Sequence, residues 1–159
     1  MGRVLLRAAI YLERFLGDGL VVLFNDPMPC PDHPERAVRM ALEMQARVSE
    51  LTESWRKSGH QLGFGIGIAQ GEATLGRIGF DRRLDYAAIG HVPNLASRLC
   101  SHAKSGQVLV SETTFQAIRN TVDGGHFGDL QLKSLEDLVP AYLVTRWRGS
   151  ETAAVLASR

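Results

Sequence analysis

The sequence has few cysteines, no excess of charge of either sign and no long hydrophobic run, and each absence excludes a class of protein. Its two cysteines, Cys30 and Cys100, lie far apart and form no metal-binding or redox motif. A net charge of +1 gives no reason to expect a nucleic acid or a membrane surface as a partner. No apolar segment approaches the roughly 20 residues that a transmembrane helix needs. Without an export or myristoylation motif, we expect a cytoplasmic protein with reduced thiols.

Local patterns predict a single α+β domain, which the length of 159 residues suits. Asp32 and Glu35 resemble a capping box, and apolar residues then recur at helical spacing until Ser58-Gly59. Further helices are predicted over residues 94–103 and 112–119, and strands over residues 10–16, 20–24, 62–71, 73–78, 108–110, 130–132 and 141–147. Helices packed on one face of a mostly antiparallel sheet predict a two-layer architecture for residues 1–148, with 149–159 as a disordered tail.

The turn Gly17-Asp18-Gly19 stands between two apolar runs and predicts a β-hairpin with Asp18 at its tip. A carboxylate on a rigid hairpin is a good ligand for a hard cation such as Mg²⁺. The same dipeptide is also the commonest hairpin signal, and taken alone it indicates only a turn.

A second segment, from Asp85 to Arg98, predicts a short strand, a tight glycine turn and a helix. Asn94 and Arg98 are four residues apart, so on a helix they project from one face on successive turns. An amide beside a permanently charged guanidinium suits a ribose and a phosphate held side by side. The alternative is an ordinary solvated helix face.

Four glycines, Gly63, Gly65, Gly67 and Gly71, invite comparison with a dinucleotide-binding loop. Their spacing is not that of the fingerprint, and no helix follows directly. Glycines inside strands instead mark places where another backbone or a substrate comes close. We therefore predict strand glycines without a phosphate-binding role.

Five separated motifs, in this order, resemble the catalytic domain of the class III adenylate and guanylate cyclases. They are residues 15–27, 65–71, 89–99, 106–111 and 130–133, the last followed by Pro140. The phrase Phe24-Asn25-Asp26-Pro27 resembles a bacterial subfamily, and the resemblance covers roughly residues 10–148. It implies a ferredoxin-like fold in which the 3′-hydroxyl of a nucleoside triphosphate attacks its own α-phosphate and pyrophosphate leaves.

The resemblance also implies roles for particular residues. Asp18 matches the second of two carboxylates that hold two cations, Mg²⁺ or Mn²⁺, in this family. Asn94 matches the residue that orients the ribose, and Arg98 the residue that stabilises charge on the phosphate in the transition state. Lys133 lies near the segment that supplies a further phosphate-binding cation. The family builds its site between two subunits, which implies a homodimer or a paired cyclase domain.

The sequence departs from the family pattern at several positions. In the family, the first metal-binding aspartate lies upstream of the hairpin on its own strand, with two helices after it. The sixteen residues before Gly17 contain no aspartate, so we expect this first strand, the two helices and one metal ligand to be missing from this sequence. Two further departures fall at positions that recognise the nucleotide base in the family. Arg14 stands where many relatives have lysine, and Ala87 stands where they have Asp or Thr. These departures leave ATP and GTP both open as substrates, with ATP favoured because it is the commoner substrate in the family.

Two main hypotheses follow from these features. The chain is either a cyclase domain that makes a 3′,5′-cyclic nucleotide for signalling, weakly active or inactive by itself, or a cyclase-like module without turnover that dimerises or binds nucleotide. Loss of one metal-binding carboxylate is expected to cost orders of magnitude in rate, because both cations act on the same developing charge. A third hypothesis is an unrelated α+β domain that senses a small molecule, because a fold does not dictate a function.

Overall fold

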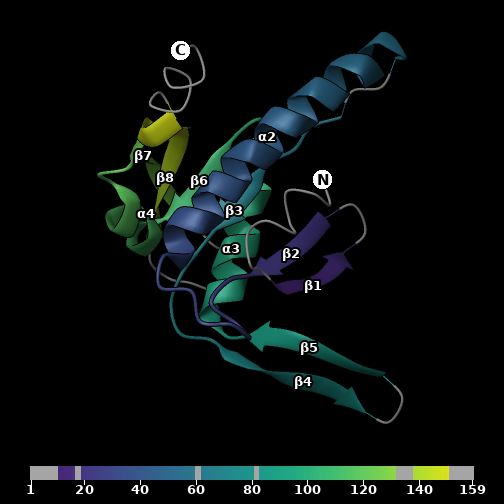
Figure 1. Cartoon of the computed structure of the whole chain (residues 1–159), viewed down its shortest axis with the longest axis vertical. Helices are drawn as coiled ribbons and strands as arrows, with labels where there is room; N and C mark the ends of the chain where they lie inside the picture. Colours follow the sequence, from purple (N-terminus) through teal and green to yellow (C-terminus); the bar gives the residue numbers. More distant parts are fainter. Residues whose placement is uncertain (1–10, 17–18, 60–61, 81–82, 132–137, 151–159) are drawn as a thin grey trace, which may run out of the picture.

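The computed structural model describes residues 11–16, 19–59, 62–80, 83–131 and 138–150, whose arrangement Figure 1 shows. The elements are β1 (Tyr11–Leu16), β2 (Gly19–Leu23), α2 (His33–Lys57), β3 (Ile66–Ile68), β4 (Thr74–Phe80), β5 (Arg83–Ile89), α3 (His91–His102), β6 (Val108–Ser111), α4 (Glu112–Ile118), β7 (Val122–Gln131), β8 (Leu138–Trp147) and the 3₁₀ helix η1 (Arg148–Ser150). All three predicted helices are present, and the α+β class is confirmed. Residues 151–159, most of the predicted tail, lie outside the described residues.

The central sheet has four strands in the order β3-β6-β8-β7, with β3 parallel to β6 and the other pairs antiparallel. Side chains alternate between the two faces of a strand, and on β6 both sets are buried. Val108 and Val110 pack with Val38 of α2 and with α4. Leu109 packs on the other side, against Leu99 of α3. Helices α2 and α4 therefore pack on one face of the sheet, as predicted, whereas α3 covers the opposite face of β6.

Helix α2 begins after Asp32, but the predicted capping box is wrong. The Asp32 side chain accepts no hydrogen bond from a backbone N–H of the first turn of the helix. Its carboxylate instead accepts hydrogen bonds from Nε of Arg36 at 2.9 Å, which hold the pKa of the Asp32 carboxyl below its usual range. The guanidinium outcompetes the backbone because it offers a charged donor one turn along the helix. None of the helices in the described ranges is long and apolar enough to cross a bilayer.

The strand predicted over residues 62–71 is much shorter, because only Ile66–Ile68 pair with β6. Helix α3 packs directly on this segment, backbone against backbone. A Cβ at Gly65 would lie 2.6 Å from the carbonyl oxygen of Ala103, and one at Gly67 would overlap the backbone of Ala96 and Cys100. The predicted close approach of another backbone is confirmed for Gly65 and Gly67, although only Gly67 lies within β3. The prediction is wrong for Gly63 and Gly71, which lie outside the strand and where a Cβ would come closest to a side chain, that of Ser105 or of Val92.

Strands β7 and β8 are both longer than predicted. β7 contains Gly124, Gly125 and Gly128 and is mostly exposed, so its sequence lacks the alternation of apolar and polar residues that identifies a strand. Its pairing with β8 also shifts register at two points. The neighbouring strand, more than local propensity, makes residues 122–131 a strand.

Two β-hairpins stand apart from the central sheet and extend to the right of α3 in Figure 1. In the first, β1 and β2 pair antiparallel with Leu16 opposite Gly19, so the predicted hairpin around Asp18 is confirmed. β2 joins the body through an apolar cluster in which its side chains pack against Met40 and Met44 of α2. β4 and β5 form the second hairpin, and β5 leads through a single residue into α3.

An ion-pair cluster at the surface ties the end of β8 and η1 to the start of β7 and predicts a pH-dependent contribution to stability. The Asp123 carboxylate accepts hydrogen bonds from Arg148 and Arg146, both at 2.8 Å, which lower its pKa. A carboxyl with a lowered pKa in the folded state stabilises the fold above its unfolded pKa of about 3.9, and that contribution is lost as the pH falls through the folded pKa.

We therefore expect Asp123→Asn to lower the melting temperature by about 1–3 °C at pH 7 and by less near pH 2, where more of the carboxyl is protonated. Circular dichroism melts at both pH values measure this difference. Glu43→Gln, at an exposed carboxyl on α2, is the matched control and should change neither value. An equal decrease for Asp123→Asn at both pH values would show that the ion pairs are not the cause.

Candidate functional site

The candidate site is built on a continuous strand and helix, β5 and α3, joined by Gly90. Gly90 has a φ of 138°, a conformation that L side chains rarely adopt, and it precedes the first residue of the helix. Gly90 allows a sharp turn between the two elements. Ala87, near the end of β5, and Asn94, near the start of α3, lie on either side of this turn. The predicted strand, glycine turn and helix are thus present in the predicted order.

Asn94 and Arg98 occupy successive turns of α3. Each directly precedes a buried leucine, Leu95 or Leu99, that anchors the helix on the sheet. Because of this offset the two polar side chains lie along the border of the buried stripe. Asn94 is exposed and Arg98 is half-buried, so an amide and a guanidinium are presented beside each other on a helix whose position the core holds.

Ala87 is buried, with 5% of its surface exposed, and its methyl group offers no hydrogen bond to a ligand. Gly76 of β4 lies opposite Ala87 in the hairpin, so neither strand contributes a polar side chain at this point. A nucleotide base at this position would meet a small apolar surface.

The side chains of three predicted site residues are not described by the structure. Asp18 and Lys133 lie outside the described residues. The backbone of Arg14 is part of β1, opposite Val21 of β2, but its side chain is not among those described. The structure therefore brings Ala87 and the Asn94–Arg98 pair together on one unit and puts Arg14 on the separate first hairpin.

Within the described ranges, no three histidine, cysteine or acidic side chains gather where they could hold a metal ion. Asp18, the carboxylate that the resemblance assigns to a cation, lies outside those ranges. Carboxylate and phosphate oxygens are suitable ligands for Mg²⁺ and Mn²⁺, which keep part of their coordination for substrate.

Sequence patterns missed one contact at the base of this unit. The phenol of Tyr86 donates a hydrogen bond of 2.6 Å to Oδ2 of Asp26, in the turn that follows β2. The two residues are sixty positions apart, so no local periodicity or turn preference links them. The only local signal is the Asn25-Asp26-Pro27 sequence, whose residue types favour a turn but do not indicate a partner for the carboxylate.

Comparison with known proteins agrees with this geometry. The chain matches the family model of the adenylate and guanylate cyclase catalytic domain over residues 3–145. The adenylyl cyclase CyaB from P. aeruginosa has a similar structure, with a TM-score of 0.86 and 30% identity over 93% of this chain and 78% of that chain. The guanylyl cyclase Cya2 gives a TM-score of 0.85 and 33% identity over 93% of this chain and 76% of that chain.

Among curated proteins, the guanylate cyclase soluble subunit beta-2 of Homo sapiens is 30% identical over 112 residues. That alignment covers 70% of this chain but 18% of the relative, so the chain spans less than a fifth of its length. The chain belongs to the family of class III adenylate and guanylate cyclase catalytic domains.

Proposed function

We propose that this chain forms half of a dimeric nucleotide cyclase site, which converts a nucleoside triphosphate to its 3′,5′-cyclic nucleotide and pyrophosphate. The single observation that carries the proposal is the Asn94–Arg98 pair, presented on a helix that the core fixes against β3, in a chain of the cyclase family. Cyclisation of this kind depends mainly on positioning and on stabilising charge, which such a rigid pair supplies.

Each proposed residue has one task. Asn94 orients the ribose through its amide, and Arg98 donates hydrogen bonds to the α-phosphate oxygens as negative charge builds on them. Lys133 adds positive charge near the phosphates. Asp18 would hold a divalent cation which, when bound, lowers the pKa of the 3′-hydroxyl and neutralises charge on the phosphates.

Base recognition rests on Arg14 and Ala87 in this proposal. Ala87 offers only a buried methyl group, so any polar contact to the base must come from elsewhere, and Arg14 is the candidate donor. The similar structures include both an adenylyl and a guanylyl cyclase. We favour ATP as the substrate, and parallel assays with ATP and GTP decide between them.

We also propose that the metal-binding hairpin of one protomer meets the Asn94–Arg98 pair of its partner. The test is cyclic-nucleotide formation with Mn²⁺, first by the unmodified chain and then by mixed variants. Asp18→Asn and Arg98→Ala should each be nearly inactive alone. An equal mixture should recover about one quarter of the normal activity, because half of the dimers are mixed and each has one intact site. No recovery on mixing would place both residues in the same protomer's site.

The second candidate function is a cyclase-like module that binds nucleotide without turnover. It is favoured by Ala87, whose buried methyl group gives a nucleotide base no hydrogen bond at the position where relatives have a polar residue. Nucleotide binding with no product under Mn²⁺ would support this candidate over the enzyme.

Asp18→Asn should weaken Mn²⁺-dependent nucleotide binding by at least about tenfold, because it removes the carboxylate that we assign to the cation. Titration calorimetry with a nonhydrolysable nucleotide, with and without Mn²⁺, measures the effect. Asp129→Asn, an exposed carboxylate on β7, is the control and should leave binding unchanged. An unaltered Mn²⁺ dependence in Asp18→Asn would remove Asp18 from the site.

A further inference from the structure

We propose that Asp26 is a positioning residue for nucleotide recognition, which acts by holding Tyr86 and, through it, the strand that carries Ala87. The inference rests on the proposed function and adds a residue that makes no contact with the nucleotide. Its starting point is the 2.6 Å hydrogen bond from Oη of Tyr86 to Oδ2 of Asp26, which joins the turn after β2 to the second hairpin.

The turn that presents Asp26 is itself held in place. Asn25 adopts a φ of 67°, and its Oδ1 accepts a hydrogen bond of 2.6 Å from the backbone N–H of Cys30, which closes the loop. Just before it, Phe24 packs in the apolar cluster with Met40 and Met44 of α2. The turn that carries the Asp26 carboxylate is thus held on one side by the packing of Phe24 on α2 and on the other by the hydrogen bond that closes the loop.

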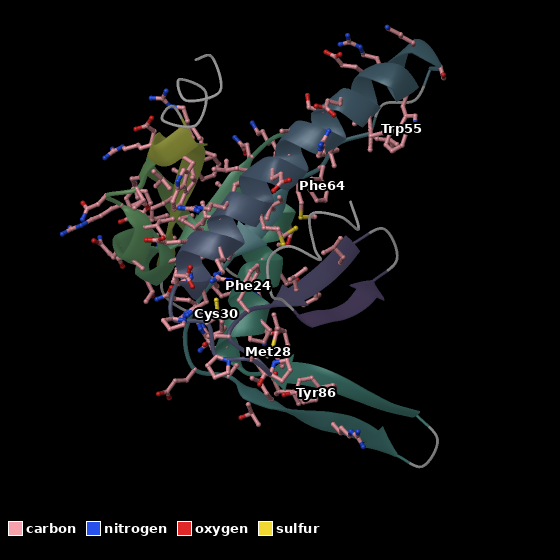
Figure 2. All side chains as sticks on the ribbon, in the orientation of Figure 1. Phe24, Met28, Cys30, Trp55, Phe64 and Tyr86 are labelled. Carbon is pink, nitrogen blue, oxygen red and sulfur yellow. The ribbon has the colours of Figure 1, made fainter. Side chains whose placement is uncertain are left out.

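Tyr86 connects this fixed turn to the site. Figure 2 shows Tyr86 on β5 reaching toward the loop that carries Met28 and Cys30. Successive residues of a strand point to opposite faces, so anchoring the Tyr86 ring on one face determines which face receives Ala87. β5 continues through Gly90 into α3, so the same anchor restrains the start of the helix that carries Asn94.

The hydrogen bond between Tyr86 and Asp26 also stabilises a part of the fold that has few other contacts to the body. β4 and β5 form a two-stranded hairpin outside the central sheet, and such hairpins are only marginally stable without further contacts. A hydrogen bond to a carboxylate is among the strong ones. Loss of the bond lowers the fraction of molecules in which β5 is correctly placed, and the apparent nucleotide affinity falls by the same factor.

Tyr86→Phe tests the proposal most directly, because it removes the hydroxyl and leaves the Asp26 carboxylate unchanged. We expect its Mn²⁺-dependent affinity for a fluorescent ATP or GTP analogue to fall about tenfold, with a similar fall for Asp26→Ala. The double variant should be no worse than either single variant, as for two residues that act through one bond. Asp26→Asn keeps an acceptor oxygen and should retain most of the affinity. Tyr142→Phe is the matched control, because it changes a tyrosine of β8 that stacks on Phe115 of α4.

Amide hydrogen exchange provides a readout that does not depend on nucleotide. In Tyr86→Phe, exchange should increase in residues 83–89 and 24–30 and stay unchanged in α2, whereas Tyr142→Phe should alter neither segment. Unchanged exchange in residues 83–89 would show that the bond does not restrain β5. If Tyr86→Phe shows faster exchange in residues 83–89 but normal nucleotide affinity, the bond stabilises the hairpin without affecting nucleotide recognition. Both results overturn the positioning role.

The same measurements separate this inference from the proposed function. If the unmodified chain binds neither ATP nor GTP, the proposed function fails and the positioning role fails with it. If the unmodified chain binds nucleotide and Tyr86→Phe binds equally well, only the positioning role fails.

Discussion

Replacing Arg98 with alanine is expected to lower the rate of cyclic-nucleotide formation by about 100- to 1,000-fold, while nucleotide affinity falls by less than about threefold. The guanidinium is assigned to charge that appears on the α-phosphate mainly in the transition state. An interaction made only in the transition state changes the turnover rate and leaves substrate binding nearly intact.

The measurement is a steady-state cyclase assay with Mn²⁺, combined with calorimetric binding of a nonhydrolysable nucleotide. Arg98→Lys keeps the charge but loses the planar fork of donors, so its rate should fall between those of the unmodified chain and the alanine variant. Arg47→Ala, which removes an exposed arginine on α2, should leave both rate and affinity unchanged. Equal losses of rate and affinity in Arg98→Ala would contradict a role confined to the transition state.

The second large effect is expected at Gly67, a residue that touches no substrate in the proposed mechanism. An added Cβ would overlap the backbone of Ala96 and Cys100, so α3 must move away from β3. Overpacking of this kind costs about 1–3 kcal/mol, which corresponds to a decrease of roughly 2–12 °C in melting temperature. Because α3 carries Asn94 and Arg98, a displacement of about 1 Å should also lower turnover by around 100-fold.

Thermal denaturation and the cyclase assay together check the Gly67→Ala prediction. Gly125→Ala on β7 is the matched control, because a Cβ there would meet no atom within 4 Å. A Gly67→Ala protein with an unchanged melting temperature would show that α3 does not pack on β3 as closely as described. Normal turnover in a destabilised variant would show that the position of α3 is less critical than we propose.

The secondary structure was most predictable where a segment carries its own signal. In α2, Ala41 and Met44 recur at helical spacing and are buried, so the pattern in the sequence is the pattern of burial. The first hairpin was recognised from the chemistry of its turn. Asn94 and Arg98 were correctly expected on successive turns of one helix, because four residues separate them on any α-helix.

Predictions were wrong where a distant or charged partner competes with the local signal. Asp32 was expected to cap α2, but the Arg36 guanidinium takes its carboxylate. A strand is predicted over residues 62–71, yet only Ile66–Ile68 pair with β6. Rules of local propensity consider a segment by itself, so they predict neither the ion pair with Arg36 nor the point at which pairing with β6 ends.

The amino-acid sequence by itself determined the helices, the first hairpin, the membership in the cyclase family and the spacing of the Asn94–Arg98 pair. Only the tertiary structure decided the length of β3 and β7, the backbone contact between α3 and Gly67, and the bond between Tyr86 and Asp26. The physical reason is the sequence separation of the residues that interact. Periodic burial and turn conformation are properties of a segment, whereas strand ends, close approaches and long-range hydrogen bonds depend on which other part of the chain folds against it.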